Sequence, residues 1–260
     1  MSAANTRLIS NIGGETVKKF TIAHMYPDLM NLYGDRGNLI CLQKRMEWYG
    51  LNCEIISIHL HDKLDFNQID MLFMGGGSDR EQGLVYHDLI RKSDQLMEQI
   101  NQGLPMLCVC GAYQLLGSYY KSQDGQKLDG LGFFPFYTVS QPGRLIGNIL
   151  LESEINGEKT TVVGFENHGG RTYFDDDTLP ELGKVIKGHG NNGVDKLEGM
   201  HFKNLIGTYL HGPLLPKNPV LADFFIQAMT ERRGEKLGPT LDDTIEKIAH
   251  DQVKHKIIAG

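Results

Sequence analysis

A short apolar run that turns directly into a helix constrains this chain more than any other stretch. Residues 105–109 (PMLCV) are typical of a buried strand, and Cys110 and Gly111 follow where a helix begins. Such an elbow places the side chain at its apex above the edge of a sheet, and small residues after the apex let the backbone turn sharply. A helix N-terminus also stabilises a thiolate through its unpaired N–H groups. Cys110 is therefore a candidate nucleophile.

Cys108 lies two residues earlier, inside the same strand. A cysteine within an apolar run is usually part of the core, and taken alone Cys110 would be interpreted in the same way. The elbow is what favours Cys110. A metal site at this Cys-x-Cys pair is a weak interpretation, because no second cysteine pair supplies the remaining thiolates. We therefore predict no metal site.

The composition excludes several classes of protein. The 260 residues are 40% hydrophobic and 22% charged, which is ordinary for a globular protein with a full core. The net charge of −6 gives no reason to expect a nucleic acid or a membrane surface as partner. Four scattered cysteines do not form a disulfide framework and suit a reducing cytosol. No run reaches the roughly 18 apolar residues of a membrane span, so we expect a cytoplasmic protein.

The first half of the chain alternates between strand and helix patterns. Strands are predicted at 20–26, 53–58, 69–74 and 105–109, and helices at 38–49, capped by Asn38, and at 85–102. This alternation predicts an α/β fold, with a mostly parallel sheet flanked by helices. Residues 1–19 are polar and are expected to form a tail.

The second half begins with a β-rich insertion. Strands are predicted at 133–139, 144–152 and 160–166, with Asn156-Gly157 marking a hairpin and a polar turn at 166–172. A last core strand, 204–213, is expected to deliver His211 from the same parallel sheet. A helix at 219–233 and an amphipathic segment at 241–258 complete the chain. We thus divide it into a tail (1–19), one domain (20–233) and a C-terminal amphipathic helix (234–260) that packs on its own domain or covers a partner.

Three features are expected to meet at the carboxyl edge of the sheet, where ligands of such folds bind. Glycines 75–77 follow one strand and Cys110 follows another. Bare backbone N–H groups in a glycine run can stabilise an oxyanion, although three glycines alone would indicate only a flexible loop. A cysteine nucleophile also needs a base, and His211 is the best placed of the ten histidines.

These stretches together resemble a known family. Residues 105–114, the glycines 75–77 and the segment Gly-Thr-Tyr-Leu-His-Gly at 207–212 resemble class I glutamine amidotransferases, and within them the cobyric acid synthase branch. Three longer stretches, 32–38, 75–82 and 164–172, resemble the GatD family, the glutaminase subunits of bacterial lipid II isoglutaminyl synthases. The likeness covers about residues 20–233. It implies the class I glutamine amidotransferase fold.

The resemblance implies hydrolysis of L-glutamine to glutamate and ammonia through a γ-glutamyl thioester. Cys110 would attack the amide carbon, and His211 would act as general base and then general acid. Backbone N–H groups near Gly76 and of Gly111 would form the oxyanion hole.

Two further residues match substrate-binding positions of the family. Arg144 would hold the α-carboxylate of glutamine in a two-pronged pair, and Gln114 would lie beside the substrate. Without the resemblance, Arg144 would be interpreted as a surface ion-pair residue and Gln114 as a helix-surface amide.

The chain departs from the family pattern in its catalytic loops. Most class I glutaminases carry Pro-Glu after the histidine, whereas here Gly212-Pro213 follows His211. The family suggests Asp35 as the replacement carboxylate, and a purely turn-stabilising role is the alternative. Ala112 stands in place of the second glycine of the elbow.

No phosphate-binding Gly-x4-Gly-Lys-Ser/Thr motif occurs in the chain. We therefore expect no cofactor here, and ATP and Mg on a partner. The resemblance implies a heterodimer with a Mur-ligase-like synthetase (MurT) that amidates the D-glutamate of the lipid II stem peptide in peptidoglycan synthesis. The alternatives are a glutaminase for another synthetase, of the cobyrinic-acid type, or a silent regulatory module, which the missing glutamate suggests.

Overall fold

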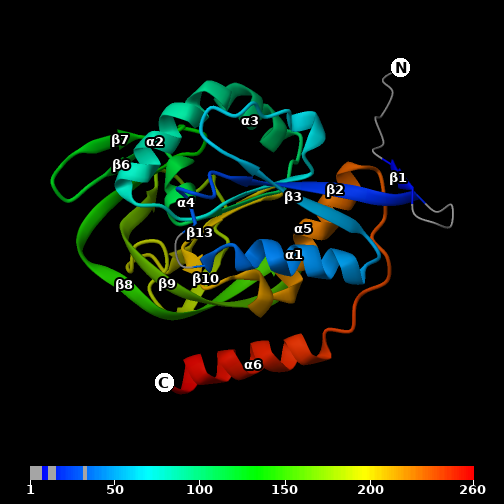
Figure 1. Cartoon of the computed structure of the whole chain (residues 1–260). Helices are drawn as coiled ribbons and strands as arrows, with labels where there is room; N and C mark the ends of the chain where they lie inside the picture. Colours follow the sequence, from blue (N-terminus) through cyan, green and yellow to red (C-terminus); the bar gives the residue numbers. More distant parts are fainter. Residues whose placement is uncertain (1–7, 11–15, 32–33) are drawn as a thin grey trace.

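The computed structural model describes residues 8–10, 16–31 and 34–260, and these form two β-sheets covered by helices (Figure 1). In the first sheet the strands lie in the order β1-β2-β4-β5-β13-β12, and β3 also pairs with β2. They are β1 Leu8–Ser10, β2 Thr16–Met25, β3 Asn52–Ile58, β4 Met71–Met74, β5 Met106–Val109, β12 Met200–Phe202 and β13 Leu205–Thr208. β1 and β12 pair antiparallel with their neighbours, and the other pairings are parallel. The predicted α/β class with a mostly parallel sheet is confirmed.

Helices cover both faces of this sheet. The helices α1 (Gly37–Trp48) and α5 (Pro219–Arg232) share one buried cluster with Phe73 of β4. The helices α2 (Asp79–Leu89) and α3 (Ser93–Asn101) share the other cluster with Leu72 and Met74. Successive residues of β4 thus face opposite clusters and are all buried, which explains why the parallel strands read as continuous apolar runs.

The second sheet is built on a long hairpin. It contains β6 Tyr119–Lys121, β7 Lys127–Asp129, β8 Phe136–Ile155, β9 Glu158–Phe174, β10 Gly183–Lys187, β11 Leu197–Glu198 and β14 Leu210–His211. Asn156 and Gly157 join β8 to β9 with φ values of 53° and 78°, as a tight hairpin turn requires. The predicted strands 133–139 and 144–152 are one strand, β8, with a register shift between Ser140 and Leu145. The predicted polar turn 166–172 lies inside β9.

Two helix predictions need correction. The helix predicted at 85–102 is two helices, because a 3-10 turn at Ile90–Lys92 separates α2 from α3. α2 already starts at Asp79, where Ser78 and Glu81 form a capping box. Asn38 does not cap α1, because it lies inside the helix and its Oδ1 accepts a hydrogen bond from the Leu215 N–H.

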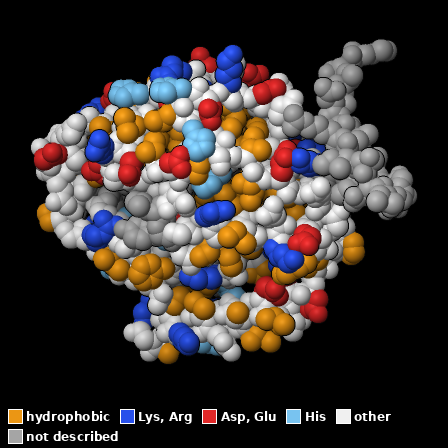
Figure 2. Space-filling model, viewed as in Figure 1, with side chains coloured by type: hydrophobic (Ala, Val, Ile, Leu, Met, Phe, Trp, Pro, Cys, Tyr) orange, Lys and Arg blue, Asp and Glu red, His pale blue; other side chains and the backbone are white. Residues whose placement is uncertain are grey.

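Parts of both chain ends belong to the folded domain. β2 begins at Thr16 and pairs with β1, so part of the predicted tail belongs to the sheet; the rest of that prediction falls outside the described residues. α6 (Thr244–Ala259) lies along the lower edge in Figure 1 and packs Ile257 against Leu150 and Val163. No helix in the described ranges is long and apolar enough to cross a bilayer. On the face in Figure 2, acidic and basic side chains are interspersed.

The prediction that His211 follows a strand of the parallel sheet is wrong. β13 ends at Thr208, and the chain then passes into the second sheet, where β14 pairs with β9 through His211 and Phe165. The buried carboxyl group of Glu198 accepts hydrogen bonds from the Thr208 hydroxyl and the Tyr209 N–H. The Tyr209 N–H is thus satisfied by a side chain rather than by a strand ladder, which allows the chain to change sheets here.

Candidate active site

Cys110 lies at the junction between the parallel sheet and a short helix. β5 ends at Val109 and α4 (Gly111–Leu115) follows at once, with Cys110 between them at φ 52°. A non-glycine residue in this left-handed conformation is strained, and such strain is concentrated at functional sites. Cys110 is half-buried, whereas Cys108 is fully buried and its burial raises the pKa of its thiol. Of the two cysteines of the elbow, Cys110 is therefore the accessible one.

His211 and Asp35 form a buried pair beside this cysteine. The His211 Nδ1–H donates to Asp35 Oδ1 at 3.1 Å, because a carboxylate can only accept. Burial opposes the charged imidazole, but hydrogen bonds to Asp35 and Cys110 outweigh it and raise the pKa of His211 to about 10. The structure thus brings together the three residues predicted to be catalytic, and favours a protonated His211 next to the sulfur.

The glycine run is shaped by close packing on this group. A side chain at Gly76 would place its Cβ 3.3 Å from both Cys110 Cβ and His211 Cε1. A side chain at Gly75 would meet the Met30 carbonyl at 2.6 Å. The Gly76 N–H donates to Asp35 Oδ2 at 3.2 Å, so the predicted oxyanion donor is engaged with Asp35. Glycine is therefore needed here for close approach, beyond any role of its N–H groups.

The other predicted oxyanion donor, Gly111, lies against the same run. A Cβ at Gly111 would be 3.0 Å from Gln82 Nε2 and 3.1 Å from the Gly77 nitrogen. Gly111 therefore packs directly against the backbone nitrogen of Gly77. Their role in binding an oxyanion stays a prediction.

A cavity of about 730 Å³ opens on Cys110. Arg144 and Gln114, the predicted substrate-binding residues, both line it. Arg144 is exposed, and its Nε and one terminal nitrogen donate to the side-chain and backbone oxygens of Asn167, at 2.6 and 2.7 Å. Gln114 is buried rather than on a helix surface, and its Nε2 donates to the Tyr209 hydroxyl at 3.0 Å. The structure thus collects every predicted site residue around one cavity or directly behind it.

Two residues that line the cavity were not predicted from the sequence. His168 of β9 is buried and stacks on Tyr209, with ring centroids 3.7 Å apart. Gln82 of α2 is also buried, and its side chain reaches the Gly77 carbonyl. Both lie in stretches that carried the family resemblance. Residues 166–170 are polar or glycine, so no apolar alternation in the sequence marks a strand; the alternating burial of positions 166, 168 and 170, which turns His168 inward, arises only in the folded chain.

No group of three or more His, Cys, Asp or Glu side chains is arranged to hold a metal ion among the residues that the structure describes.

The chain is similar to known proteins over most of its length. Residues 21–219 match the CobB/CobQ-like glutamine amidotransferase domain. The GatD subunit of the glutamine-hydrolyzing lipid II isoglutaminyl synthase of Staphylococcus aureus (strain N315) is 45% identical over 235 residues, which are 90% of this chain and 94% of that protein. The corresponding GatD of Streptococcus pneumoniae (strain ATCC BAA-255 / R6) is 38% identical over 242 residues, 92% of each chain.

Solved structures share the fold at low sequence identity. A glutamine amidotransferase crystal structure matches with a TM-score of 0.51 at 13% identity, covering 80% of this chain and 98% of that one. The glutaminase domain of Trypanosoma brucei CTPS with bound acivicin matches with a TM-score of 0.51 at 12% identity, covering 84% and 95%. At such low sequence identities these matches show the fold alone.

Proposed function

The chain belongs to the CobB/CobQ-like glutamine amidotransferase family, and from this premise we propose that it is the glutaminase subunit of a lipid II isoglutaminyl synthase. It would hydrolyse L-glutamine to glutamate and ammonia. The observation that carries the proposal is the placement of Cys110, at a strained elbow, in a cavity shared with Arg144 and beside the His211–Asp35 pair. The two GatD relatives, matched over more than nine-tenths of their length, support the choice of substrate.

In the proposed reaction the Cys110 sulfur attacks the carboxamide carbon of glutamine, and the thiol proton resides on His211. The tetrahedral intermediate collapses as His211 returns this proton to the departing nitrogen, which leaves as ammonia. Water then attacks the thioester carbon and gives a proton to His211. Collapse releases glutamate and restores the cysteine, so one water is consumed for each glutamine.

Asp35 orients the base in this scheme. Its carboxylate holds Nδ1–H of His211, so that the other ring nitrogen, Nε2, exchanges the proton with sulfur and substrate. An imidazolium held in this way also stabilises negative charge on the sulfur before attack. The hypothesis of a silent module rested on the missing glutamate after His211, and Asp35 supplies a carboxylate at that nitrogen from another loop.

Arg144 would bind the α-carboxylate of glutamine. Its guanidinium is oriented by two hydrogen bonds to Asn167 and lines the cavity that opens on Cys110. An arginine fork matches the two oxygens of a carboxylate, and a pre-oriented fork loses little freedom on binding. Gln114 would contribute to the wall next to the bound substrate.

We further propose that the ammonia is consumed by a Mur-ligase-like synthetase (MurT) in a cytoplasmic heterodimer. The relatives are named as subunits of a glutamine-hydrolyzing synthase, which supports a separate acceptor-activating chain. ATP and Mg would bind to that partner, and the amidated group would be the D-glutamate of the lipid II stem peptide.

The proposal is tested by glutamate release from glutamine, with the protein alone and with the synthetase added. Cys110→Ala should lose at least about 1,000-fold in kcat, because the nucleophile is removed. Cys108→Ala is the matched control two residues away and should retain most of its activity. An essential Cys108 would contradict the assignment of the nucleophile. No glutamate release from the wild-type complex would contradict the proposed reaction, and activity only with a cobyrinic-acid-type synthetase would change the acceptor.

A further inference from the structure

The loops that carry Asp35 and His211 touch each other just beyond the catalytic pair. Gly37, two residues after Asp35, packs on Pro213, two residues after His211: a Cβ on Gly37 would lie 2.5 Å from Pro213 Cγ. One residue further along, within α1, Asn38 Oδ1 accepts a hydrogen bond of 2.8 Å from the Leu215 N–H. We call the Gly37–Pro213 contact and the Asn38–Leu215 hydrogen bond the loop clasp.

We propose that the loop clasp positions Asp35 against His211, with Gly37, Asn38 and Pro213 as positioning residues. The inference rests on the proposed function, in which the Asp35–His211 pair orients the base. These two residues are 176 positions apart, so no local backbone geometry sets their distance. A glutamate two residues after the histidine would need no such device, and here that position is Pro213, a part of the clasp.

The contact with Pro213 explains why residue 37 is a glycine. It is the first residue of α1 and its φ is not in the left-handed region, so its backbone conformation does not require glycine. The three heavy atoms nearest to a Cβ at Gly37, at 2.5, 3.0 and 3.4 Å, all belong to the Pro213 ring. A side chain there would push the two loops apart.

The identity of Asn38 is also explained by a contact with the second loop. Its side chain is fully buried, and its Oδ1 holds the backbone of the second loop, while its Nδ2 has no hydrogen-bond partner in the described part of the chain. A buried donor without a partner is costly, so the amide is not the most stable choice for packing alone. It is the choice that ties α1 to the 211–215 loop.

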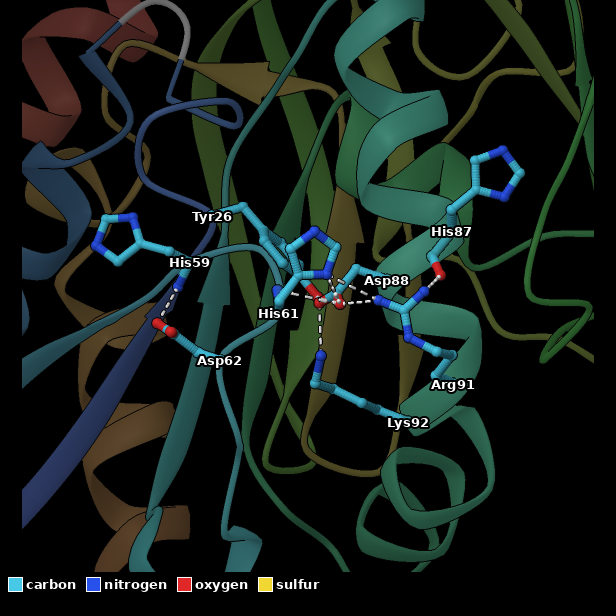
Figure 3. A network of polar contacts seen from close by, with 8 residues as sticks. All are labelled: Tyr26, His59, His61, Asp62, His87, Asp88, Arg91 and Lys92. Carbon is cyan, nitrogen blue, oxygen red and sulfur yellow. Dashed lines mark hydrogen bonds and ion pairs between the residues drawn. The ribbon is translucent and has the colours of Figure 1, made fainter.

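The other end of the first loop is also anchored, as Figure 3 shows. Tyr26, at the end of β2, donates its hydroxyl to the buried Asp88 at 2.8 Å. Lys92 donates to the same carboxylate at 2.5 Å, and Arg91 and the His61 backbone N–H donate to its other oxygen. The segment that carries Asp35 therefore runs between two fixed points, and the loop clasp is the one beside the catalytic pair.

The test uses Gly37→Ala, Pro213→Ala and the double variant in the complex with the synthetase. Gly37→Ala should lower kcat about 100-fold with little change in KM, because misplacing a catalytic group by about 1 Å has this effect and Asp35 does not touch the substrate. Pro213→Ala removes Cγ, which would lie 2.5 Å from the new Cβ, and leaves Pro213 Cβ at 3.0 Å, so the double variant should recover most of the kcat that Gly37→Ala loses. Gly83→Ala is the matched control, since Gly83 lies inside helix α2 with nothing within 4 Å of its Cβ.

A second readout separates positioning from general damage. Asp35, Cys110 and, from β9, His168 face His211, and Asp35 is the carboxylate that holds its proton. The pKa of the His211 imidazole, followed by NMR, should therefore fall toward its ordinary value in Gly37→Ala and rise again in the double variant. Unchanged kcat and an unchanged His211 pKa in Gly37→Ala would overturn the proposal, as would a double variant no better than Gly37→Ala. Failure of the proposed function itself would show differently, as a wild-type complex that releases no glutamate.

Discussion

One ring nitrogen of His168 forms a hydrogen bond, and the other has no hydrogen-bond partner among the described residues. The Gly170 carbonyl lies 2.7 Å from Nδ1, and a carbonyl only accepts, so Nδ1 carries the proton. Burial lowers the pKa of His168 to about 3, which keeps the ring neutral. Nε2 is then a bare acceptor, buried and without a hydrogen-bond partner among the described residues. Because His168 lines the cavity that opens on Cys110, this acceptor is suited to an N–H donor of the substrate.

Replacing His168 by asparagine or by glutamine distinguishes its two nitrogens. His168→Asn keeps a donor near Nδ1 and removes the acceptor, so we expect KM for glutamine to rise about tenfold, the equivalent of one lost hydrogen bond. His168→Gln places an amide group near Nε2 and should lose less. Steady-state glutaminase kinetics give both values. Equal KM values for the two variants would show that Nε2 contacts no substrate.

The residues of the site differed in how far the sequence could predict them. Cys110 and His211 stood in motifs whose chemistry is local, so both could be nominated from the sequence. Asp35 was an even choice between catalysis and turn formation, since only the folded chain brings it to His211. His168 was missed because its stretch was interpreted as a turn, and a residue in a turn has no inward face.

At the scale of elements, three segments far apart in sequence meet at one arginine. Arg45 of α1 is 3% exposed and forms ion pairs of 2.7 Å with Asp223 of α5 and with Asp243, just before α6. Each of the two carboxylates accepts two hydrogen bonds from the guanidinium. This fork joins the C-terminal helix to the α1–α5 layer, which the amphipathic pattern of 241–258 could not reveal.

Loss of this arginine should be costly. Arg45→Ala leaves two carboxylates near each other and partly buried without their cation, and we expect the free energy of unfolding to fall by about 3 to 5 kcal/mol. Urea denaturation of the purified protein measures it. Lys44→Ala is the control on the adjacent residue, whose exposed pair with Glu47 should contribute about 0 to 1 kcal/mol. Similar losses in both variants would contradict a special role for the fork.

At the scale of the whole molecule, Glu198 lies where the chain passes from one sheet to the other. Its carboxyl group is fully buried, and burial raises its pKa to about 8 despite hydrogen bonds from Tyr209 and Thr208. Its second oxygen has no partner in the described part of the chain, which fits a protonated group. The crossover that places His211 is thus built on a neutral carboxyl group.

This group makes stability depend on pH in a defined direction. Between the ordinary pKa of 4.5 and about 8 the folded chain holds a proton at Glu198 that the unfolded chain has lost. Its contribution is therefore complete below pH 4.5 and is lost as the pH rises toward 8, by up to about 1.4 kcal/mol per pH unit. Glu198→Gln removes this titration, so its stability relative to wild type should increase with pH across the window. Chemical denaturation at pH 5, 6, 7 and 8 tests this, and a difference independent of pH would refute it.

The sequence by itself determined the fold class and the family and nominated Cys110 as the nucleophile, because strand periodicity, the elbow and the glycine run are local patterns that act over a few residues. Only the tertiary structure decided that β8 is one strand, that His211 belongs to the second sheet, and that Asp35 meets it across 176 positions. These outcomes depend on contacts between distant segments, such as Gly37 on Pro213 and Glu198 on Tyr209. No pattern within a single segment carries that information.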